Sequence, residues 1–174
     1  ARDGRVFYAS MHQYRHFRHF GECVLDQALV PHVGLDRYRI EGRGLEHIQQ
    51  ATKAGKGLIL LGAHFGPWQF GAVGLGQKGI TVNIAAVMQE ARAMDAYLTA
   101  QRERSTHPMP EILLLSGETP FSSLSVVDAL RQGKVVALHA DRTILGKSAR
   151  VPFLGDEASF PLGPFVLAEV TGAP

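Results

Sequence analysis

The segment Gly57-Leu-Ile-Leu-Leu-Gly-Ala-His64-Phe-Gly-Pro-Trp-Gln69-Phe70 decides the fold class of this chain. Its first part, Leu58 to Leu61, is an unbroken apolar run, which is typical of a strand buried on both faces of a parallel sheet. Gly66 and Pro67 then favour a turn followed by a helix, because proline is tolerated in the first helical turn. His64 is therefore predicted to lie on a strand-to-helix turn, where open α/β sheets place their chemistry.

The alternation of strands and helices continues along the chain. Further strands are predicted at residues 38–42, 80–87, 112–115, 135–138 and 149–153. Helices are predicted at residues 45–54, 68–75, 91–104, 123–131 and 160–170, and residues 154–157 are predicted to form a turn. Strands that alternate with helices imply βαβ units. The predicted fold class is therefore α/β, with a mostly parallel central sheet flanked by helices.

The length and composition indicate one globular domain over residues 1–174, with an amino-terminal helical segment at residues 1–34. The chain has 174 residues, of which 45% are hydrophobic and 20% charged. Its formal net charge of +2 is too small to indicate a nucleic-acid partner. A single cysteine, Cys23, excludes an internal disulfide. Because the chain starts at Ala1 and stops at Pro174, just after a predicted helix, we expect a truncated piece of a longer protein.

Basic and aromatic residues interleave in the segment Tyr14-Arg-His-Phe-Arg-His-Phe20 of the amino-terminal helix. Such a helix can lie in a membrane interface, with its rings among the headgroups and its arginines on phosphates. The alternative is that the aromatic stripe packs against the rest of the domain. The sequence leaves both interpretations open.

Two segments contain candidate catalytic or binding residues. His64, at a predicted strand end, can take a proton from a hydroxyl near neutral pH. The segment His139-Ala-Asp141-Arg142 occupies the equivalent place after another predicted buried strand. Arg142, Lys147 and Arg150 can bind an anionic group, since arginine matches the geometry of phosphate oxygens. The sequence has no nucleophile elbow, P-loop or dinucleotide fingerprint.

Residues 60–69 resemble the first motif of the lysophospholipid acyltransferase superfamily, most closely in the branch of the bacterial lipid A biosynthesis (late) acyltransferases. That motif is a His followed, after four residues, by Asp or Glu. Residues 130–142, 151–155, 158–161 and 163–168 are similar to the later blocks of the family in order and spacing. The resemblance covers roughly residues 35–174 and implies an acyltransferase-like fold.

The resemblance implies transfer of a fatty acyl group from an acyl carrier protein or coenzyme A thioester to a hydroxyl of a lipid or glycolipid. The thioester is a co-substrate, and no cofactor is expected. His64 is the expected general base, with Gln69 in the position of its partner. The resemblance also implies peripheral association with the cytoplasmic side of the inner membrane. The expected substrate-binding residues are Trp68, Arg102, Asp141 and Arg142.

Gln69 departs from the family motif, which has an acidic residue there. An amide oxygen can orient the imidazole of His64 but carries no charge to stabilise an imidazolium. Three alternatives remain open: Gln69 holds the productive tautomer, another carboxylate such as Asp141 or Glu90 supplies the charge, or the domain is weak or inactive and binds lipid. If the lost charge limits the rate, Gln69→Glu is expected to raise turnover. A thioester or ester hydrolase that activates water is a third functional class.

Overall fold

The computed structural model describes residues 2–87, 98–99, 110–115, 123–143 and 146–174. Its helices are α1 (Arg2–Val33), a short 3-10 helix η1 (Leu35–Arg37), α2 (Leu45–Lys53), α3 (Gln69–Gln77), α5 (Leu124–Arg131) and α6 (Gly163–Thr171). Its strands are β1 (Leu58–Gly62), β2 (Val82–Val87), β3 (Glu111–Leu115), β4 (Val135–His139), β5 (Ser148–Phe153) and β6 (Asp156–Pro161).

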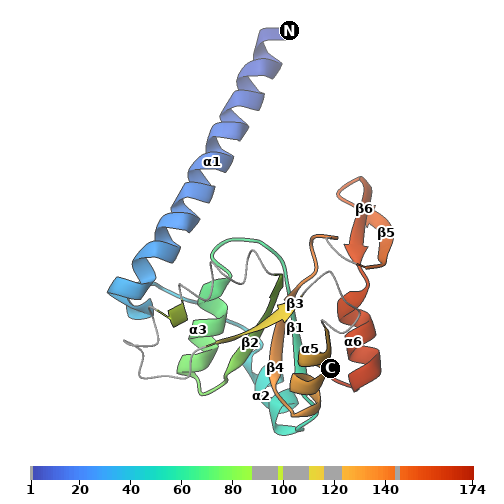
Figure 1. Ribbon diagram of the computed structural model, residues 1–174. Coiled ribbons are helices and arrows are strands. Elements are labelled where there is room, and N and C mark those ends of the chain that lie inside the picture. Colours follow the sequence, from blue (N-terminus) through green and yellow to red (C-terminus); the bar gives the residue numbers. More distant parts are fainter. Residues whose placement is uncertain (1, 88–97, 100–109, 116–122, 144–145) are drawn as a thin grey trace.

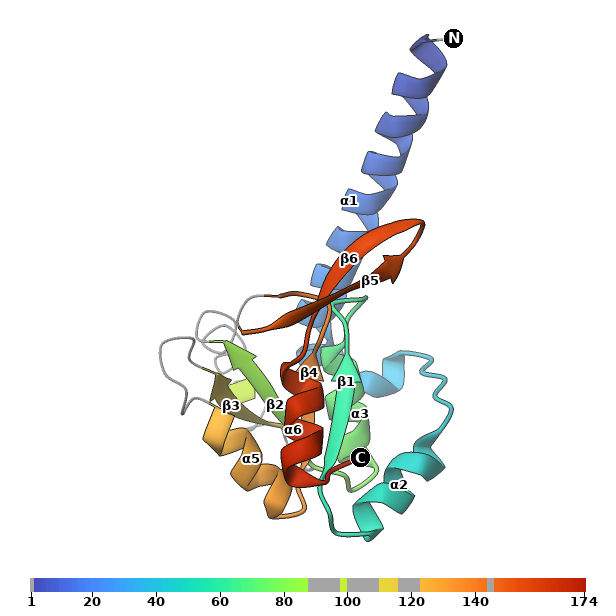
Figure 2. The same cartoon turned by 90° about the vertical axis from the view of Figure 1, so that its right-hand side faces the viewer.

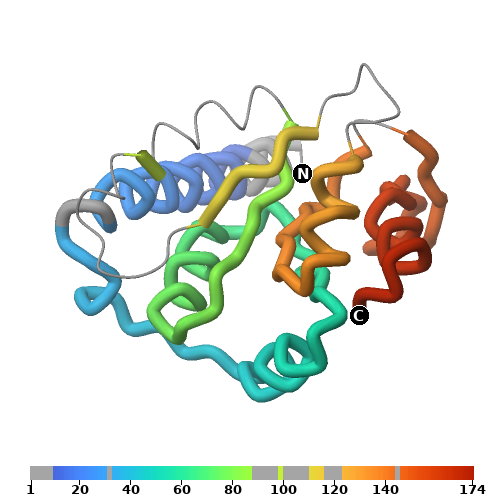
Figure 3. Tube along the Cα trace, turned by 60° about the horizontal axis from the view of Figure 1, so that its bottom comes forward, coloured from blue at the N-terminus to red at the C-terminus, as the bar shows by residue number. Residues whose placement is uncertain are grey.

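Four of these strands form a parallel sheet in the order β1-β4-β2-β3, and helices cover both of its faces (Figures 1 and 3). The predicted fold class is thus confirmed. The crossover after β1 places β4 and not β2 beside it, so the ends of β1 and β4 are neighbours although they are far apart in sequence. In the pairing of these two strands Gly62 lies opposite His139.

Side chains of the central strands alternate between two apolar clusters, as the period of a strand requires. On β4, Val135 and Ala137 pack towards α2 and α3, whereas Val136 and Leu138 pack towards α5 and α6. Both faces of β4 are therefore buried, which explains its unbroken apolar sequence. The same alternation directs His139, the last residue of β4, towards the α3 side of the sheet.

A close approach of two backbones fixes the start of β1. Gly57 has a φ of +74°, and a Cβ atom built on it would lie 2.4 Å from the carbonyl oxygen of Leu130 at the end of α5. Only glycine fits both the positive φ and the available space. The strand that leads to His64 is thereby held directly against the end of α5.

Helix α1 projects away from the sheet, and its carboxyl end is the part that contacts the domain (Figures 1 and 2). There the Tyr38 hydroxyl donates a hydrogen bond of 3.3 Å to Asp26, and the Tyr38 ring meets Phe70 edge-on. The aromatic side chains Tyr14, Phe17 and Phe20 are 63–71% exposed, so they do not pack on the sheet. Within the described residues, no helix is both long enough and apolar enough to cross a membrane.

Strands β5 and β6 form an antiparallel hairpin at the carboxyl end of β1 (Figure 2). The structure differs from two of the sequence predictions.

The predicted start of the last helix at residue 160 is wrong. Residues 156–161 form the second strand of this hairpin, and α6 begins only at Gly163, after Pro161 has ended β6. The segment Tyr38–Gly42 is not a strand: it pairs with no strand of either sheet, and residues 39–42 are exposed. The predicted helix at residues 91–104 falls almost entirely outside the described residues.

Candidate active site

The turn after β1 places His64 at the carboxyl edge of the sheet. Gly66 adopts a φ of +64°, a conformation that glycine takes without strain. Short backbone hydrogen bonds tighten the turn, from the N–H of Phe65 to the carbonyl of Ala63 (2.8 Å) and from Trp68 to Gly66 (3.0 Å). Helix α3 then begins at once, at Gln69. The side chain of His64 is consequently presented beside the end of β4.

Asp141, two residues beyond the end of β4, binds His64 twice. One carboxylate oxygen lies 2.9 Å from the ring Nδ1 of His64, and the other accepts the backbone N–H of His64 at 3.1 Å. Since a carboxylate only accepts hydrogen bonds, we assign the ring proton to Nδ1. In the neutral ring, Nε2 then carries the basic lone pair. This is the arrangement in which an imidazole acts as a general base while a carboxylate orients it.

The surroundings of the Asp141 carboxylate favour its charged form. Partial burial is the largest single influence and raises the pKa of Asp141, but hydrogen bonds from the ring and backbone N–H of His64 and from its own backbone together outweigh it. The pKa of Asp141 therefore lies below its usual value of 3.8. Near neutral pH the group facing His64 is a carboxylate, ready to stabilise an imidazolium.

Two further rings surround the imidazole of His64. The ring of His139 lies 4.2 Å from it between centroids, with an interplanar angle of 34°. The indole of Trp68 meets His139 edge-on at 4.3 Å, and is itself 6.2 Å from His64. His64 is thus held along one edge by a carboxylate and on one face by a second imidazole.

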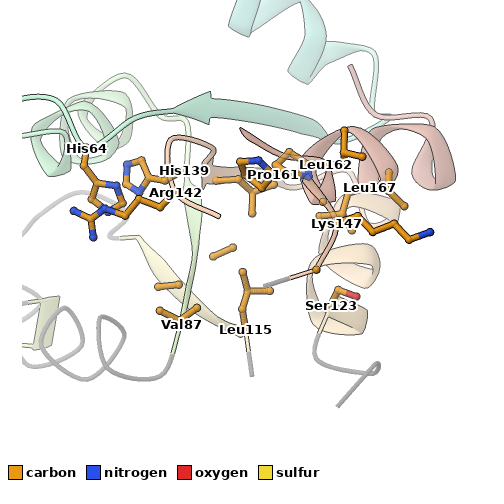
Figure 4. A pocket seen from close by; sticks show the side chains of 17 residues that line it. His64, Val87, Leu115, Ser123, His139, Arg142, Lys147, Pro161, Leu162 and Leu167 are labelled. Atoms are coloured by element: carbon orange, nitrogen blue, oxygen red, sulfur yellow. The ribbon is translucent and has the colours of Figure 1, made fainter. Parts of the chain in front are cut away.

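His64 opens into a cavity of about 400 Å³, here named the histidine cavity (Figure 4). His64, His139 and Arg142 lie together at one end of it, whereas Lys147 lies among apolar residues of the far wall. Most of the remaining lining is apolar: Ala85, Ala86, Val87, Leu115, Leu138, Pro161, Leu162, Pro164, Val166 and Leu167. A cavity of this volume and lining suits an apolar ligand with a few polar groups.

A second cavity of about 700 Å³, the hairpin cavity, lies between the end of β1 and the β5–β6 hairpin. Asp141 contributes to its wall, and most of the rest is apolar, including Leu61, Val151, Phe160 and Phe165. Pro161 and Leu162 line both cavities. The His64–Asp141 pair therefore lies between two apolar spaces, with His64 lining one and Asp141 the other.

Comparison with known proteins adds to this geometry. The family model for the bacterial lipid A biosynthesis acyltransferases matches residues 15–174. The chain belongs to this family. Two phosphatidylinositol mannoside acyltransferases of Mycobacterium tuberculosis strains are each 33% identical over 132 residues, which is 75% of this chain and 40% of the relative. One from Mycolicibacterium smegmatis is 28% identical over 131 residues, 74% of this chain and 41% of the relative.

The family comparison confirms the resemblance seen in the sequence. The chain spans about 40% of the length of the curated relatives that it matches. Nothing in these matches assigns roles to individual residues. The assignment of site residues in this chain therefore rests on the geometry described above.

The structure brings together some of the predicted site residues. His64, Trp68, Asp141 and Arg142 gather at the ends of β1 and β4, whereas Arg102 and Glu90 lie outside the described residues. The Gln69 side chain makes no hydrogen bond to His64; its Oε1 is buried, and no donor in the described part of the chain reaches it. Arg150 pairs with Glu157 across the hairpin at 3.0 Å and lines neither cavity.

The Asp141 carboxylate is expected to stabilise the fold in a pH-dependent way. Because its folded pKa lies below 3.8, its contribution is present above that pH and is lost as the pH falls through the lowered folded value. We expect Asp141→Asn to lower the free energy of unfolding near neutral pH by on the order of 1 kcal/mol. Denaturant titrations from neutral to acid pH measure this loss, which should shrink below pH 3.8. The exposed Asp128→Asn is the control, and a loss that stays constant with pH would contradict the assignment.

The unpaired oxygen of Gln69 gives a second prediction. Gln69→Leu removes no hydrogen bond to Oε1, so stability should be unchanged or rise by up to about 1 kcal/mol. Gln69→Glu should lower stability, since it places a negative charge on a buried oxygen that has no donor. Thermal unfolding of the two variants under one condition tests this order. A Leu variant less stable than the Glu variant would show that the amide oxygen has a partner.

Proposed function

We propose that the protein transfers a fatty acyl group from an acyl thioester, of acyl carrier protein or coenzyme A, to a hydroxyl of a lipid or glycolipid. The observation that carries this proposal is the His64–Asp141 pair, with the Nδ1 of His64 2.9 Å from the carboxylate and the ring at the wall of a largely apolar cavity. Family membership supports the same reaction class.

In the proposed reaction, the Nε2 of His64 takes the proton of the acceptor hydroxyl as its oxygen attacks the thioester carbonyl carbon. The resulting tetrahedral intermediate collapses as the C–S bond breaks, and the leaving thiolate receives the proton from the imidazolium. Asp141 keeps the ring in the productive tautomer and stabilises its charged form, as the carboxylate of a catalytic triad does. No covalent acyl-enzyme is needed.

The oxyanion of the intermediate needs hydrogen-bond donors, and the backbone N–H groups near the His64 turn are the candidates. Three of them are already engaged in the fold, because the N–H of His64 donates to Asp141, that of Phe65 to Ala63 and that of Trp68 to Gly66. We therefore assign oxyanion stabilisation to the other N–H groups of the turn.

We propose a phosphate-bearing glycolipid as the acceptor. The curated relatives are named for acylation of phosphatidylinositol mannoside, an acceptor that carries both sugar hydroxyls and a phosphate. Arg142 and Lys147 supply positive charge at two separate parts of the histidine cavity, and its apolar wall suits a hydrocarbon chain. Trp68 supports the end of this cavity through His139.

We also propose that the protein works at a membrane surface, on the cytoplasmic side of the inner membrane. The exposed Tyr14, Phe17 and Phe20 on α1 alternate with Arg15 and Arg18. Aromatic rings and arginines in this pattern suit the interface, where rings lie among headgroups and guanidinium groups meet phosphates. The composition of α1 therefore suits that contact.

The reaction is tested by incubating the purified protein with a radiolabelled acyl thioester and phosphatidylinositol mannoside, and then separating the lipids. Labelled acceptor lipid is the expected product, and His64→Ala and Asp141→Asn should each lower its rate by on the order of 10²–10⁴. Gln69→Glu should not raise the rate, because the negative charge of Asp141 already lies beside the ring of His64. Free fatty acid as the sole product would indicate a hydrolase, and binding without turnover a lipid-binding domain.

The two basic residues of the cavity give a separate prediction. Arg142→Ala and Lys147→Ala should each raise KM for the phosphate-bearing acceptor by about tenfold, since a charge-assisted hydrogen bond is worth roughly that factor. Arg150→Ala is the matched control, because Arg150 is bound to Glu157 and lines neither cavity. Initial rates at varied acceptor concentration measure the effect. Equal KM values in all three variants would show that neither Arg142 nor Lys147 binds the acceptor.

A further inference from the structure

A second histidine, His139, is in van der Waals contact range of the proposed base. Its ring stacks on the imidazole of His64 with centroids 4.2 Å apart, and it lines the same cavity. Trp68 contacts His139 edge-on at 4.3 Å and lies 6.2 Å from His64, so it lies beside both imidazoles. The three rings come from three elements, namely the end of β4, the turn after β1 and the residue before α3.

The backbone makes this stack possible. His139 ends β4 opposite Gly62, the last residue of β1, and a Cβ atom at Gly62 would lie 3.4 Å from Cδ2 of His139. The imidazole therefore lies directly against the end of the neighbouring strand, at the distance of an ordinary van der Waals contact from a Cβ at position 62. The alternation along β4 directs the same ring towards the α3 side, where Trp68 lies. The position of His139 is thus fixed by the sheet and not by a loop.

The Asp141 hydrogen bond alone does not fix the orientation of His64, because a ring held at one nitrogen can still tilt and so bend and weaken that bond. A ring packed on the face of the imidazole removes this freedom. The stack therefore assists the step in which Nε2 removes the acceptor proton.

We propose that His139 is a positioning residue for His64: its ring face, supported by Trp68, holds the imidazole with Nδ1 on Asp141 and Nε2 directed into the histidine cavity. Its effect on turnover rests on the proposed acyl transfer. Its effect on the ring of His64 does not, because the stack exists without substrate. The ring face of His139 supplies this positioning, so phenylalanine, which keeps such a face, should hold the imidazole of His64 as histidine does.

The test compares His139→Phe, which keeps a ring, with His139→Leu, which fills the space without one, and with His139→Ala. His47→Ala, which removes an exposed histidine on α2, is the control. Nitrogen-15 NMR of the histidine side chains, at a pH well above the ordinary imidazole pKa of about 6.5, reports which nitrogen of His64 carries the proton. The Nδ1–H tautomer should dominate in the wild type and in His139→Phe, and should decline in His139→Leu and His139→Ala.

In the acyl-transfer assay, His139→Leu and His139→Ala should lower kcat by on the order of tenfold or more, with KM changed by less than about twofold, because only the orientation of the base is lost. His139→Phe should retain most of kcat. An unchanged tautomer in His139→Leu, or a His139→Phe variant as impaired as His139→Leu, would overturn the proposal. Should the wild type show no acyl transfer, the NMR comparison alone still decides whether His139 positions His64.

Discussion

The carboxylate of Asp141 is the group on which the geometry of the site depends, because it accepts both the ring and the backbone N–H of His64. A ring contact alone would link Asp141 only to the side chain of His64. The second hydrogen bond fixes the backbone of the turn after β1 to the residue that follows β4. One side chain therefore binds both the ring and the turn, and its charge is retained because the donors outweigh the effect of burial on its pKa.

This contact exists because β1 and β4 are neighbours in the sheet. Parallel neighbours end at the same edge, so the residues after both strands meet there. The two faces of the sheet then contribute different groups to the surroundings of His64. The α3 side supplies Trp68 against His139, while residues of β2, β4 and α6 build the apolar wall of the histidine cavity. The β5–β6 hairpin adds a second apolar space on the Asp141 side. One sheet edge thus combines a polar pair with apolar surroundings.

The sequence was sufficient to predict the strands of the sheet, the fold class and the place of His64, since apolar runs bounded by glycine are local signals. It could not predict that Asp141, 77 residues away, is the partner of His64. The order of strands in a parallel sheet has no local signal in the sequence. Gln69, which is close in sequence, and the distant Asp141 and Glu90 were therefore all possible partners of His64. The hairpin strand at residues 156–161 was missed for a related reason, because its ladder depends on pairing with β5, and Pro161 suggested a helix start instead.

The departure at Gln69 follows from the same geometry. Two carboxylates facing one imidazole repel each other, and one of them then has a strongly raised pKa and loses its charge. With Asp141 already on Nδ1, an acid at the first turn of α3 would add desolvation without a donor to satisfy it, since even the neutral amide oxygen of Gln69 is buried and unpaired there. An amide at position 69 is therefore compatible with a charged partner for His64. In this chain the negative charge comes from the end of β4, while the helix that follows His64 contributes a neutral residue.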